Sequence, residues 1–542
     1  MSMIIHSLAY IHPDREIQFQ HISFAIAKGE KAALVGNNGT GKSTLLQIIA
    51  GLLQPSAGDV AFTGSTYFVP QHLGQYDNCS IAEALGIAQE LNAYEAILQG
   101  DVSAENFTLL NDDWTIEERV QQAFSFWHLQ HLSLRQPMHL LSGGEKTKVF
   151  LAGIQIHEPE IILLDEPSNH LDADSRELLY DFISKSKATV LLVSHDRTLL
   201  NLTDTTLELT KTGVEVFGGN YDFYKTLKDE KLEALEAQLD EKEKTLKQTQ
   251  QKARALIEQR QKQEVRGKAH GQKQNLPKIV AGNLKSKAEV STAKTRDIQQ
   301  EKIQEIGEGL RQIRTQIQAQ QVLKIDLRKS DLHQGKILVE AKDINFGYQA
   351  ALLWALPLSF QIRSGDRIRI EGNNGSGKTT LLQLIMGLLQ PSVGAIYRAD
   401  FNYLYIDQNY SLIDNQLTVF EQTQRLNERQ LPEHELKMLL HYHQFPKEVW
   451  DRKCEALSGG EKMKLILCCV AIRNHTPDML IVDEPTNNLD VYSQEVMTQA
   501  IRVYEGTLLV ISHDQHFINE IGLKQRIILE KLKSFETLGL ER

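Results

Sequence analysis

Residues 36–43 read GNNGTGKS, and residues 372–379 read GNNGSGKT. Both fit the pattern G-x-x-x-x-G-K-[ST], whose glycines let the backbone curl so that successive N–H groups point at phosphate oxygens. The first octapeptide follows an apolar stretch at 32–35 and precedes a helix-like run at 43–53, and the second repeats this arrangement. A strand, a glycine-rich loop and a helix in this order predict two phosphate-binding loops (P-loops).

Each P-loop offers groups for a nucleotide and for a cation. We expect Lys42 and Lys378 to reach the β- and γ-phosphates, and Ser43 and Thr379 to offer a hydroxyl group to Mg²⁺. The N-terminus of the following helix adds its partial positive charge. The residues predicted to bind ATP in the two loops are Gly36, Asn37, Asn38, Gly39, Thr40, Gly41, Lys42, Ser43 and Thr44, and Gly372, Asn373, Asn374, Gly375, Ser376, Gly377, Lys378, Thr379 and Thr380.

The P-loop belongs to a series of segments that occurs twice in the same order. The other repeated segments are GLLQPS (51–56 and 387–392), LSGGEK (141–146 and 457–462), ILLDEPSNHLD or LIVDEPTNNLD (162–172 and 480–490) and SHD (194–196 and 512–514). A series repeated in order indicates an internal duplication. We therefore predict two α/β cassettes, the first with a short insertion at about 91–114.

Two carboxylates end the apolar stretch 161–164. Asp165 can hold Mg²⁺, and Glu166 can polarise the attacking water as the base of a phosphoryl transfer. Asp483 and Glu484 occupy the matching positions in the second cassette. Because each pair lies downstream of a P-loop, we predict two catalytic centres with Asp165 and Asp483 as metal ligands and Glu166 and Glu484 as bases.

A histidine follows each of these glutamates at the same distance. His195 lies 29 residues after Glu166, and His513 lies 29 residues after Glu484. A lone histidine is more often a structural residue, but equal spacing in two cassettes favours contact of both imidazoles with the γ-phosphate. We therefore predict His195 and His513 as catalytic residues.

Together these motifs resemble those of ATP-binding cassette (ABC) ATPases, and the resemblance covers both cassettes. It implies that the LSGG segment of one cassette binds the γ-phosphate of a nucleotide held by the P-loop of the other. Two ATP molecules would then join the cassettes head to tail. The residues implied are Ser142, Gly143, Gly144 and Glu145 for the site of Lys378, and Ser458, Gly459, Gly460 and Glu461 for the site of Lys42.

The same resemblance implies four further site residues. Gln71 and Gln408 match the glutamines that sense Mg²⁺ and the attacking water in this family. Tyr10 and Tyr348 lie 26 and 24 residues before the first glycine of their P-loops, where the family places an aromatic ring that stacks on adenine. Ordinary packing within a strand is the alternative for each tyrosine.

The chain carries no pattern for targeting or membrane insertion. Its N-terminus has no basic segment followed by an apolar core, and its apolar runs are shorter than the about 20 residues that a membrane-spanning helix needs. We expect a cytoplasmic protein without a membrane domain, and no obligate homo-oligomer. The four cysteines show no CxxC spacing and indicate free thiols.

Tandem cassettes without a spanning segment, LSGGE, DEPSNHLD and the segment GGNYDFYKTLKDEK (218–231) are similar to the ABC-F family. The resemblance implies a ribosome-associated ATPase. Its ATP-bound closed form would enter the tRNA exit (E) site of the 50S subunit and extend the inter-cassette linker toward P-site tRNA, rRNA and the peptidyl-transferase centre. A narrower implication is protection of the ribosome against antibiotics that bind near that centre.

The linker has an unusual composition. Residues 225–345 contain no Phe, Trp, Tyr or Cys, so we expect no compact globular core there. Apolar residues instead follow a 3,4 spacing over 232–256 and again over 303–317, which predicts two helices that share one apolar seam. Pro277 and Gly282 indicate a turn between them. The prediction is an antiparallel helical hairpin.

Positive charge is concentrated around the predicted tip of this hairpin. Residues 252–296 hold twelve Lys or Arg and three acidic side chains, a net charge of +9, although the whole chain has a net charge of −11. Without aromatic side chains, contact with phosphate is favoured over base stacking. The predicted nucleic-acid contacts are Arg266, Lys268, Lys273, Lys278, Lys285 and Lys287.

The predicted domains are a first cassette at 1–222, a hairpin linker at 223–335 and a second cassette at 336–542. Two other functions remain possible from the residues. An ATPase subunit of a separately encoded membrane exporter would also lack spanning segments, but it would not need a cationic linker. A DNA-maintenance ATPase usually splits one cassette around a long coiled coil, whereas each cassette here is complete.

Overall fold

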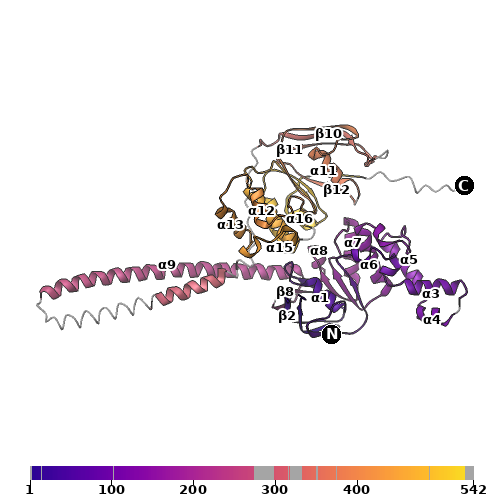
Figure 1. The fold of residues 1–542 in the computed structure, drawn as a ribbon, viewed down its shortest axis with the longest axis horizontal. Coiled ribbons are helices and arrows are strands. Elements are labelled where there is room, and N and C mark those ends of the chain that lie inside the picture. The colour runs from indigo at the N-terminus through magenta and orange to yellow at the C-terminus, as the bar shows by residue number, and fades with distance from the viewer. Residues whose placement is uncertain are drawn as a thin grey trace. The chain divides into compact units, whose positions relative to one another are not determined.

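The computed structural model describes residues 3–13, 15–101, 103–210, 212–273, 298, 300–314, 317, 332–348, 352–373, 375–486 and 489–530. The chain divides into two compact units. One unit contains both cassettes and comprises Met1–Asp222 together with Leu323–Arg542, and the other is Phe223–Val322. Figure 1 shows the course of the chain through both units.

The first cassette is built on a six-stranded sheet in the order β5-β6-β7-β3-β8-β9. Its neighbouring strands run parallel, except that β8 and β9 form an antiparallel pair. All five residues of β6 and of β7 are buried, as their unbroken apolar sequences require. The strands are β3 (Lys31–Val35), β5 (Thr66–Val69), β6 (Ile161–Asp165), β7 (Thr189–Val193), β8 (Thr205–Thr210) and β9 (Gly213–Phe217).

A second, antiparallel sheet has the order β2-β1-β4. Its strands are β1 (Met3–Ile11), β2 (Ile17–Ile26) and β4 (Ala57–Phe62). Buried side chains of this sheet, such as Ile5 and Phe19, share one apolar core with Leu34 of β3 and with Leu45 and Leu46 of the helix α1. The P-loop helix is therefore fixed on both sheets by packing.

Helices complete the first cassette. They are α1 (Lys42–Ile49), α2 (Ile81–Ala84), α3 (Ala88–Leu98), α4 (Ala104–Leu110), α5 (Ile116–Phe126), α6 (Gly143–His157), α7 (Ala173–Lys185) and α8 (Arg197–Leu200), with 3-10 turns at Gly74–Tyr76 and Met138–Leu140. The predicted insertion at about 91–114 falls mainly on α3 and α4, which pack against each other. Residues 88–114 contain six acidic and no basic side chains.

The second cassette repeats this architecture. Its main sheet has the order β14-β15-β16-β12-β17, which matches β5-β6-β7-β3-β8, and its antiparallel sheet has the order β11-β10-β13. The chain passes directly from α12 to α13, so residues 88–110 are an addition to the first cassette.

The strands are β10 (Ile337–Asn345), β11 (Leu358–Arg363), β12 (Arg367–Glu371), β13 (Val393–Arg398), β14 (Tyr403–Ile406), β15 (Met479–Asp483), β16 (Thr507–Ile511) and β17 (Gln525–Ile528). The helices are α11 (Lys378–Met386), α12 (Val419–Arg425), α13 (Glu433–Tyr442), α14 (Gly459–Ile472), α15 (Val491–Val503) and α16 (Gln515–Glu520), with 3-10 turns at Lys447–Val449 and Cys454–Ala456. The predicted α/β fold with two cassettes is confirmed.

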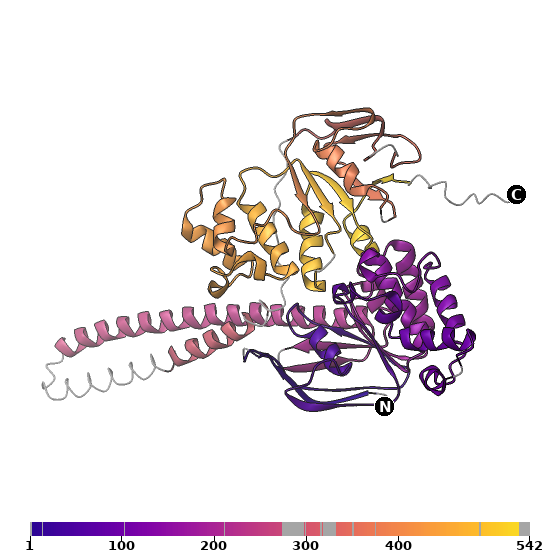
Figure 2. The ribbon, with the colours of Figure 1, turned by 45° about the vertical axis from the view of Figure 1, so that its right-hand side comes forward.

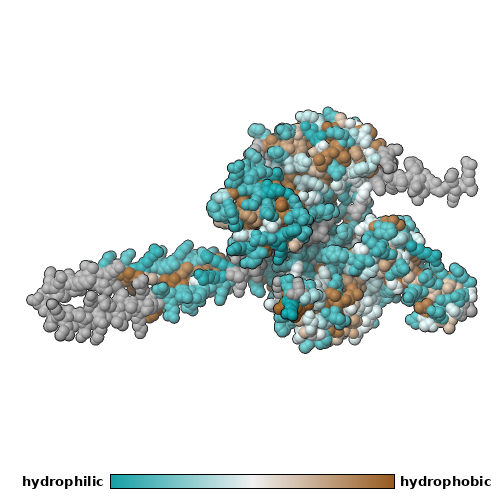
Figure 3. All heavy atoms as spheres, in the orientation of Figure 1, coloured by the Kyte–Doolittle hydropathy of each residue, from teal (hydrophilic) through white to brown (hydrophobic). Residues whose placement is uncertain are grey.

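The linker begins with α9 (Tyr221–Lys273), a helix of 53 residues. Residues 300–314 are also helical and run beside it, as Figures 1 and 2 show. The guanidinium group of Arg314 lies 2.6 Å from a carboxylate oxygen of Glu243, which joins the two helices. The described linker surface is mainly hydrophilic with small apolar patches (Figure 3).

The apolar seam predicted for the hairpin is visible in the burial of its second helix. Leu310, Ile313 and Ile317 are buried, with 3–6% of each residue exposed. The predicted turn at Pro277 and Gly282 lies outside the described residues. Among the described helices, none combines the length and the apolar character needed to cross a bilayer.

Leu310→Ala tests whether this seam holds the second helix in place. Removing a buried leucine side chain costs about 2–4 kcal/mol, so we expect faster amide hydrogen exchange in residues 300–314. Ile257→Ala is the control, because Ile257 is 46% exposed, and it should leave exchange nearly unchanged. Equal exchange in wild type and Leu310→Ala would contradict the packing.

Candidate functional site

Both P-loops enter their helices through a glycine in the left-handed conformation. Gly41 has φ 96° and Gly377 has φ 88°, a region that other residues rarely adopt. A Cβ atom on Gly41 would also lie 2.8 Å from a ring carbon of Phe19, and one on Gly377 would lie 3.1 Å from Nε1 of Trp354. Backbone shape and close packing therefore both require glycine here.

The P-loop lysines lie inside the curled loops. Nζ of Lys42 donates to the carbonyl oxygens of Gly36 at 2.7 Å and Asn37 at 3.2 Å. Nζ of Lys378 donates to the carbonyl oxygen of Gly372 at 2.6 Å. Burial lowers the pKa of each lysine below its ordinary value. The loop carbonyls thus orient the ammonium group of each lysine, which can contact a phosphate bound in the same P-loop.

Both predicted catalytic glutamates have strained backbones. Glu166 has φ 53° and Glu484 has φ 47°, although neither is glycine. The backbone N–H of Glu166 donates to the carbonyl oxygen of Val193 at 2.8 Å, and that of Glu484 donates to the carbonyl oxygen of Ile511 at 2.8 Å. Hydrogen bonds to the neighbouring strand therefore hold each glutamate in this left-handed conformation.

A histidine lies beside each glutamate. Nε2 of His195 is 3.2 Å from Oε1 of Glu166, and Nε2 of His513 is 3.4 Å from Oε1 of Glu484. The backbone N–H of each histidine also donates to the other carboxylate oxygen of the neighbouring glutamate, at 3.3 Å. The predicted base and the predicted histidine of each centre are therefore brought together.

Burial sets the protonation of these groups. Burial, with the charge of Asp165 adding to it, raises the pKa of Glu166 to about 8, and burial raises the pKa of Glu484 to about 7. Burial also lowers the pKa of His195 to about 3 and that of His513 to about 4. At neutral pH both imidazoles are therefore neutral, and both carboxyl groups titrate close to that pH.

The predicted metal ligands offer oxygen atoms that suit a hard cation. Oδ1 of Asp165 is buried and finds no hydrogen-bond partner among the described residues. Burial raises the pKa of Asp165, while a hydrogen bond with Ser43 lowers it. In the second cassette, Oδ2 of Asp483 accepts from Thr379 at 3.5 Å. A carboxylate and a hydroxyl oxygen at each centre fit Mg²⁺.

A cavity of about 320 Å³ joins most of the first centre. Its lining includes the predicted residues Asn38, Gly39, Gly41, Lys42, Ser43, Thr44, Gln71, Asp165, Glu166 and His195. It also includes Gln18 and Asn169, which the sequence analysis did not predict. Nε2 of Gln18 donates to the carbonyl oxygen of Gly39 at 2.6 Å. A glutamine on a strand far before the loop carries no motif, so only the folded chain identifies it.

The two predicted adenine-stacking tyrosines differ in their surroundings. Tyr10 packs against Phe19, with ring centroids 6.4 Å apart, and it is partly buried against the core. Tyr348 is 67% exposed, and its hydroxyl lies 3.0 Å from that of Thr380 at the P-loop helix. Stacking on adenine remains a prediction for both. Tyr348 has the exposed ring that this role needs.

The LSGGE segments form the N-termini of α6 and α14. Ser142 caps α6, and Glu145 accepts from the backbone N–H of Ser142 at 2.8 Å, which closes a capping box. Ser458 and Glu461 form the same arrangement on α14. The two glutamates therefore fix the helix ends that carry the predicted γ-phosphate contacts.

The second cassette contributes one contact to the first P-loop that the sequence analysis missed. The backbone N–H of Asn38 donates to Oδ2 of Asp490 at 3.0 Å. Oδ1 of Asp490 also accepts from the backbone N–H of Ser493 and caps α15. Asp490 occurs in a repeated motif, but the spacing of motifs along the chain does not indicate that it contacts Asn38 in the other cassette.

Several other predicted site residues fall at three kinds of position. Gln408 is exposed, and Asn374 lies outside the described residues. Arg266 is exposed on α9. Lys268 and Lys273 belong to the last turns of α9, and the other predicted nucleic-acid contacts, Lys278, Lys285 and Lys287, lie outside the described residues.

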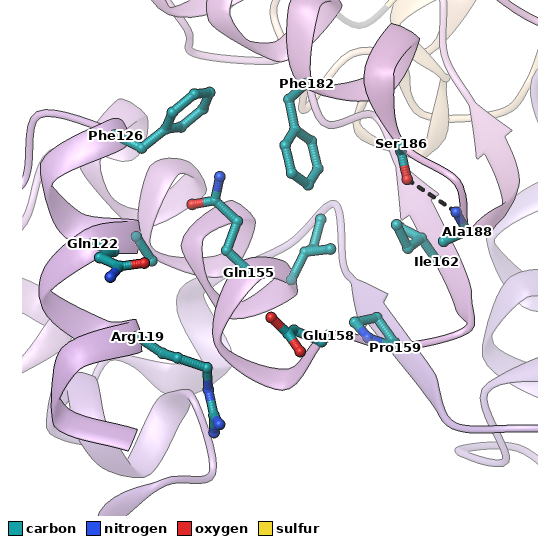
Figure 4. Close-up of a pocket in the computed structure, with 12 residues that line it drawn as sticks. Arg119, Gln122, Phe126, Gln155, Glu158, Pro159, Ile162, Phe182, Ser186 and Ala188 are labelled. Carbon is teal, nitrogen blue, oxygen red and sulfur yellow. Dashed lines mark hydrogen bonds between the residues drawn. The ribbon is translucent and has the colours of Figure 1, made fainter. Parts of the chain in front are cut away.

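A second cavity in the first cassette has a volume of about 530 Å³. Figure 4 shows Phe126 of α5, Gln155 of α6 and Phe182 of α7 around it. Oε1 of Gln155 is buried there without a hydrogen-bond partner among the described residues. The residues predicted for ATP line the other cavity, so this one is separate from the catalytic centre.

The raised glutamate pKa values predict how stability depends on pH. A carboxyl group whose pKa is higher in the folded chain stabilises it fully below the unfolded pKa and loses this effect as pH rises through the folded pKa. Wild type should therefore lose stability as pH rises from about 5 to 8, whereas Glu166→Gln/Glu484→Gln should lose much less, because glutamine does not titrate. Urea midpoints of the nucleotide-free chains measure this.

The exposed Glu105→Gln serves as the control for this comparison, because Glu105 lies on α4 at the surface. It should follow the pH dependence of wild type. A double variant whose urea midpoint changes with pH as steeply as that of wild type would show that the two buried glutamates do not cause the effect.

Comparison with known proteins agrees with this architecture. The sequence pattern described as "ABC transporter" matches residues 19–169 and 356–487. ABC transporter F family member 5 of Arabidopsis thaliana is 30% identical over 529 residues, which cover 92% of this chain and 71% of the relative. The uncharacterized ABC transporter ATP-binding protein YfmM of Bacillus subtilis (strain 168) is 28% identical, with 96% of each chain covered.

Among solved structures, the archaeal ribosome recycling factor aABCE1, in its complex with archaeal ribosomal stalk protein aP1, superposes with a TM-score of 0.57 at 19% identity. The match covers 96% of this chain and 87% of that one, and it concerns the fold. Two family matches, an F-family relative along almost the whole chain and two P-loop cassettes lead to one conclusion. The chain is an ABC ATPase and belongs to the ABC-F family.

Proposed function

We propose that this ABC-F ATPase binds the ribosome when its cassettes hold ATP, and that hydrolysis releases it. The observation that carries the proposal is the combination of two P-loop cassettes with one cationic segment between them. Residues 252–296 have a net charge of +9, whereas the whole chain has a net charge of −11. A chain that is acidic elsewhere and cationic in one segment directs its contact with a polyanion to that segment.

Hydrolysis follows from the residues of each centre. The P-loop N–H groups and Lys42 or Lys378 hold the phosphates, and Glu166 or Glu484 accepts a proton from the attacking water. A base whose pKa is near neutral is well matched to this task. Ser43 with Asp165, and Thr379 with Asp483, would hold Mg²⁺, which neutralises phosphate charge when bound. Gln71 and Gln408 are proposed to orient the water.

ATP is proposed to bind between the cassettes. Each LSGGE helix N-terminus would face the nucleotide of the other cassette, and the contact between Asn38 and Asp490 supports an approach of the two cassettes at the first P-loop. Closure driven by two ATP molecules gives the chain two states with different linker positions. The energy of nucleotide binding can then control what the linker contacts.

The ribosome is the favoured polyanion because rRNA and tRNA combine dense phosphate with fixed geometry. The recycling factor with the similar fold is named for its action on ribosomes, which supports the same partner here. The E site of the 50S subunit, P-site tRNA and nearby rRNA are the contacts proposed for the linker. The basic residues proposed to make them are Arg266, Lys268, Lys273, Lys278, Lys285 and Lys287.

Glu166→Gln/Glu484→Gln tests the ATP-dependent part of the proposal. Loss of both bases should slow hydrolysis at least about 100-fold and leave the ATP-bound chain attached to ribosomes in a pelleting assay. Lys42→Ala/Lys378→Ala removes the phosphate contacts and should not pellet with ATP. Pelleting of the glutamine variant no greater than that of wild type, or pelleting with membranes instead, would refute the ribosome proposal.

A second experiment tests the cationic segment. Changing Lys273, Lys278, Lys285 and Lys287 to Gln should weaken ribosome binding about tenfold and reduce its salt dependence, because fewer phosphate contacts release fewer counterions. ATP binding should stay unchanged. The matched control changes four lysines in residues 225–251 of α9, which hold six basic and seven acidic side chains, namely Lys231, Lys242, Lys244 and Lys247. An equal effect of both sets would show that position along the linker does not matter.

A further inference from the structure

Arg197, the first residue of α8, contacts side chains of the second cassette. Its Nη2 lies 3.1 Å from Oε1 of Glu495 on α15. Its Nη1 lies 3.1 and 3.2 Å from the two ring nitrogens of His516 and 3.8 Å from Oε1 of Glu520. Only 11% of the Arg197 side chain and 13% of the Glu495 side chain are exposed. The ion pair is therefore largely shielded from solvent and salt.

The duplication shows that this ion pair is specific to one half of the chain. Residues 194–197 read SHDR, whereas residues 512–515 read SHDQ. Gln515 therefore occupies the position of Arg197 in the second cassette. Glu177 corresponds to Glu495, because each lies five residues after the aspartate that caps its helix. Because the side chain of Gln515 carries no charge, Gln515 and Glu177 cannot form the corresponding ion pair.

The two partners of the pair belong to elements that meet at the first ATP centre. Arg197 follows His195 by two residues, and His195 lies 3.2 Å from Glu166. Glu495 lies on α15, whose capping residue Asp490 accepts the backbone N–H of Asn38 in the first P-loop. The ion pair thus connects the segment of His195 to the helix whose N-terminus contacts the P-loop of the same centre.

An ion pair in this position favours one geometry of that centre. Replacing Arg197 alone would leave the carboxylate of Glu495 without this cation in a region that is mostly closed to solvent, which costs more than loss of an exposed pair. His516 and Glu520 surround the guanidinium group from the other side, so Arg197 has partners on two helices of the second cassette. The second ATP centre has Gln515 in place of this arginine.

We propose that Arg197 is a positioning residue that ties the second cassette to the first ATP centre and makes the two centres inequivalent. Because Gln515 cannot form the ion pair that Arg197 forms, the first centre closes on ATP more readily than the second. The inference concerns the ATPase reaction itself and does not depend on the ribosome as partner.

The test measures each centre separately. Glu484→Gln leaves only the first centre able to hydrolyse, and Glu166→Gln leaves only the second. In the Glu484→Gln chain we expect Arg197→Glu to lower kcat/KM for ATP about tenfold, a typical size for coupling between two sites. In the Glu166→Gln chain we expect a change of less than about twofold.

A charge swap separates positioning from a general loss of structure. Arg197→Glu with Glu495→Arg restores opposite charges at the two positions and should recover most of the lost kcat/KM at the first centre. Gln515→Glu places the same carboxylate at the equivalent position of the second cassette, and it should leave the first centre unchanged. The proposal is supported if the charge swap recovers kcat/KM at the first centre and Gln515→Glu leaves kcat/KM at that centre unchanged.

Three results would overturn it. These are an equal loss at both centres, a swap that recovers nothing, and a loss with Gln515→Glu as large as that with Arg197→Glu. Thermal unfolding of each variant shows whether it is folded. If Arg197→Glu does not fold, Arg197→Gln copies the residue of the second cassette, and unchanged kinetics at the first centre in that variant would equally refute the role of Arg197.

Discussion

The curl of the P-loop is the constraint on which both cassettes depend. It needs a glycine in the left-handed conformation at Gly41 and Gly377, where a side chain would meet Phe19 or Trp354. It also needs a lysine whose ammonium group is held by the loop carbonyls. Because the helix after the loop packs into the core between two sheets, the phosphate-binding geometry is fixed by the same contacts that stabilise the fold.

Local parts of this structure could be predicted because their causes lie close together in the sequence. The strand before each P-loop, the helix after it and the buried strand ending in Asp165 all occur where the apolar runs indicated. The proximity of His195 to Glu166 could be predicted because parallel neighbouring strands end at one edge of a sheet. Duplication made each of these predictions stronger, because every motif occurred twice.

Other site features depend on tertiary structure and carry no pattern in the sequence. Gln18 reaches the P-loop from a different sheet, and Asp490 and Arg197 act across the two cassettes. Tyr10 and Tyr348 have similar spacing before their P-loops but different surroundings, since Tyr10 packs against Phe19 and Tyr348 is exposed. Spacing reports where a residue is in the chain, while packing decides which way its ring or carboxylate points.

The helices α3 and α4 make the two cassettes of the duplicated chain distinguishable to a partner. Two equivalent cassettes could exchange places by a half-turn, and a partner could then bind such a molecule in two orientations. The first cassette alone carries this additional pair of helices, and residues 88–114 contain six carboxylates and no basic side chain, although Arg119 and Arg135 pair with two of them. A half-turn would bring these carboxylates to a different surface of the partner, so the two orientations no longer have equal energy.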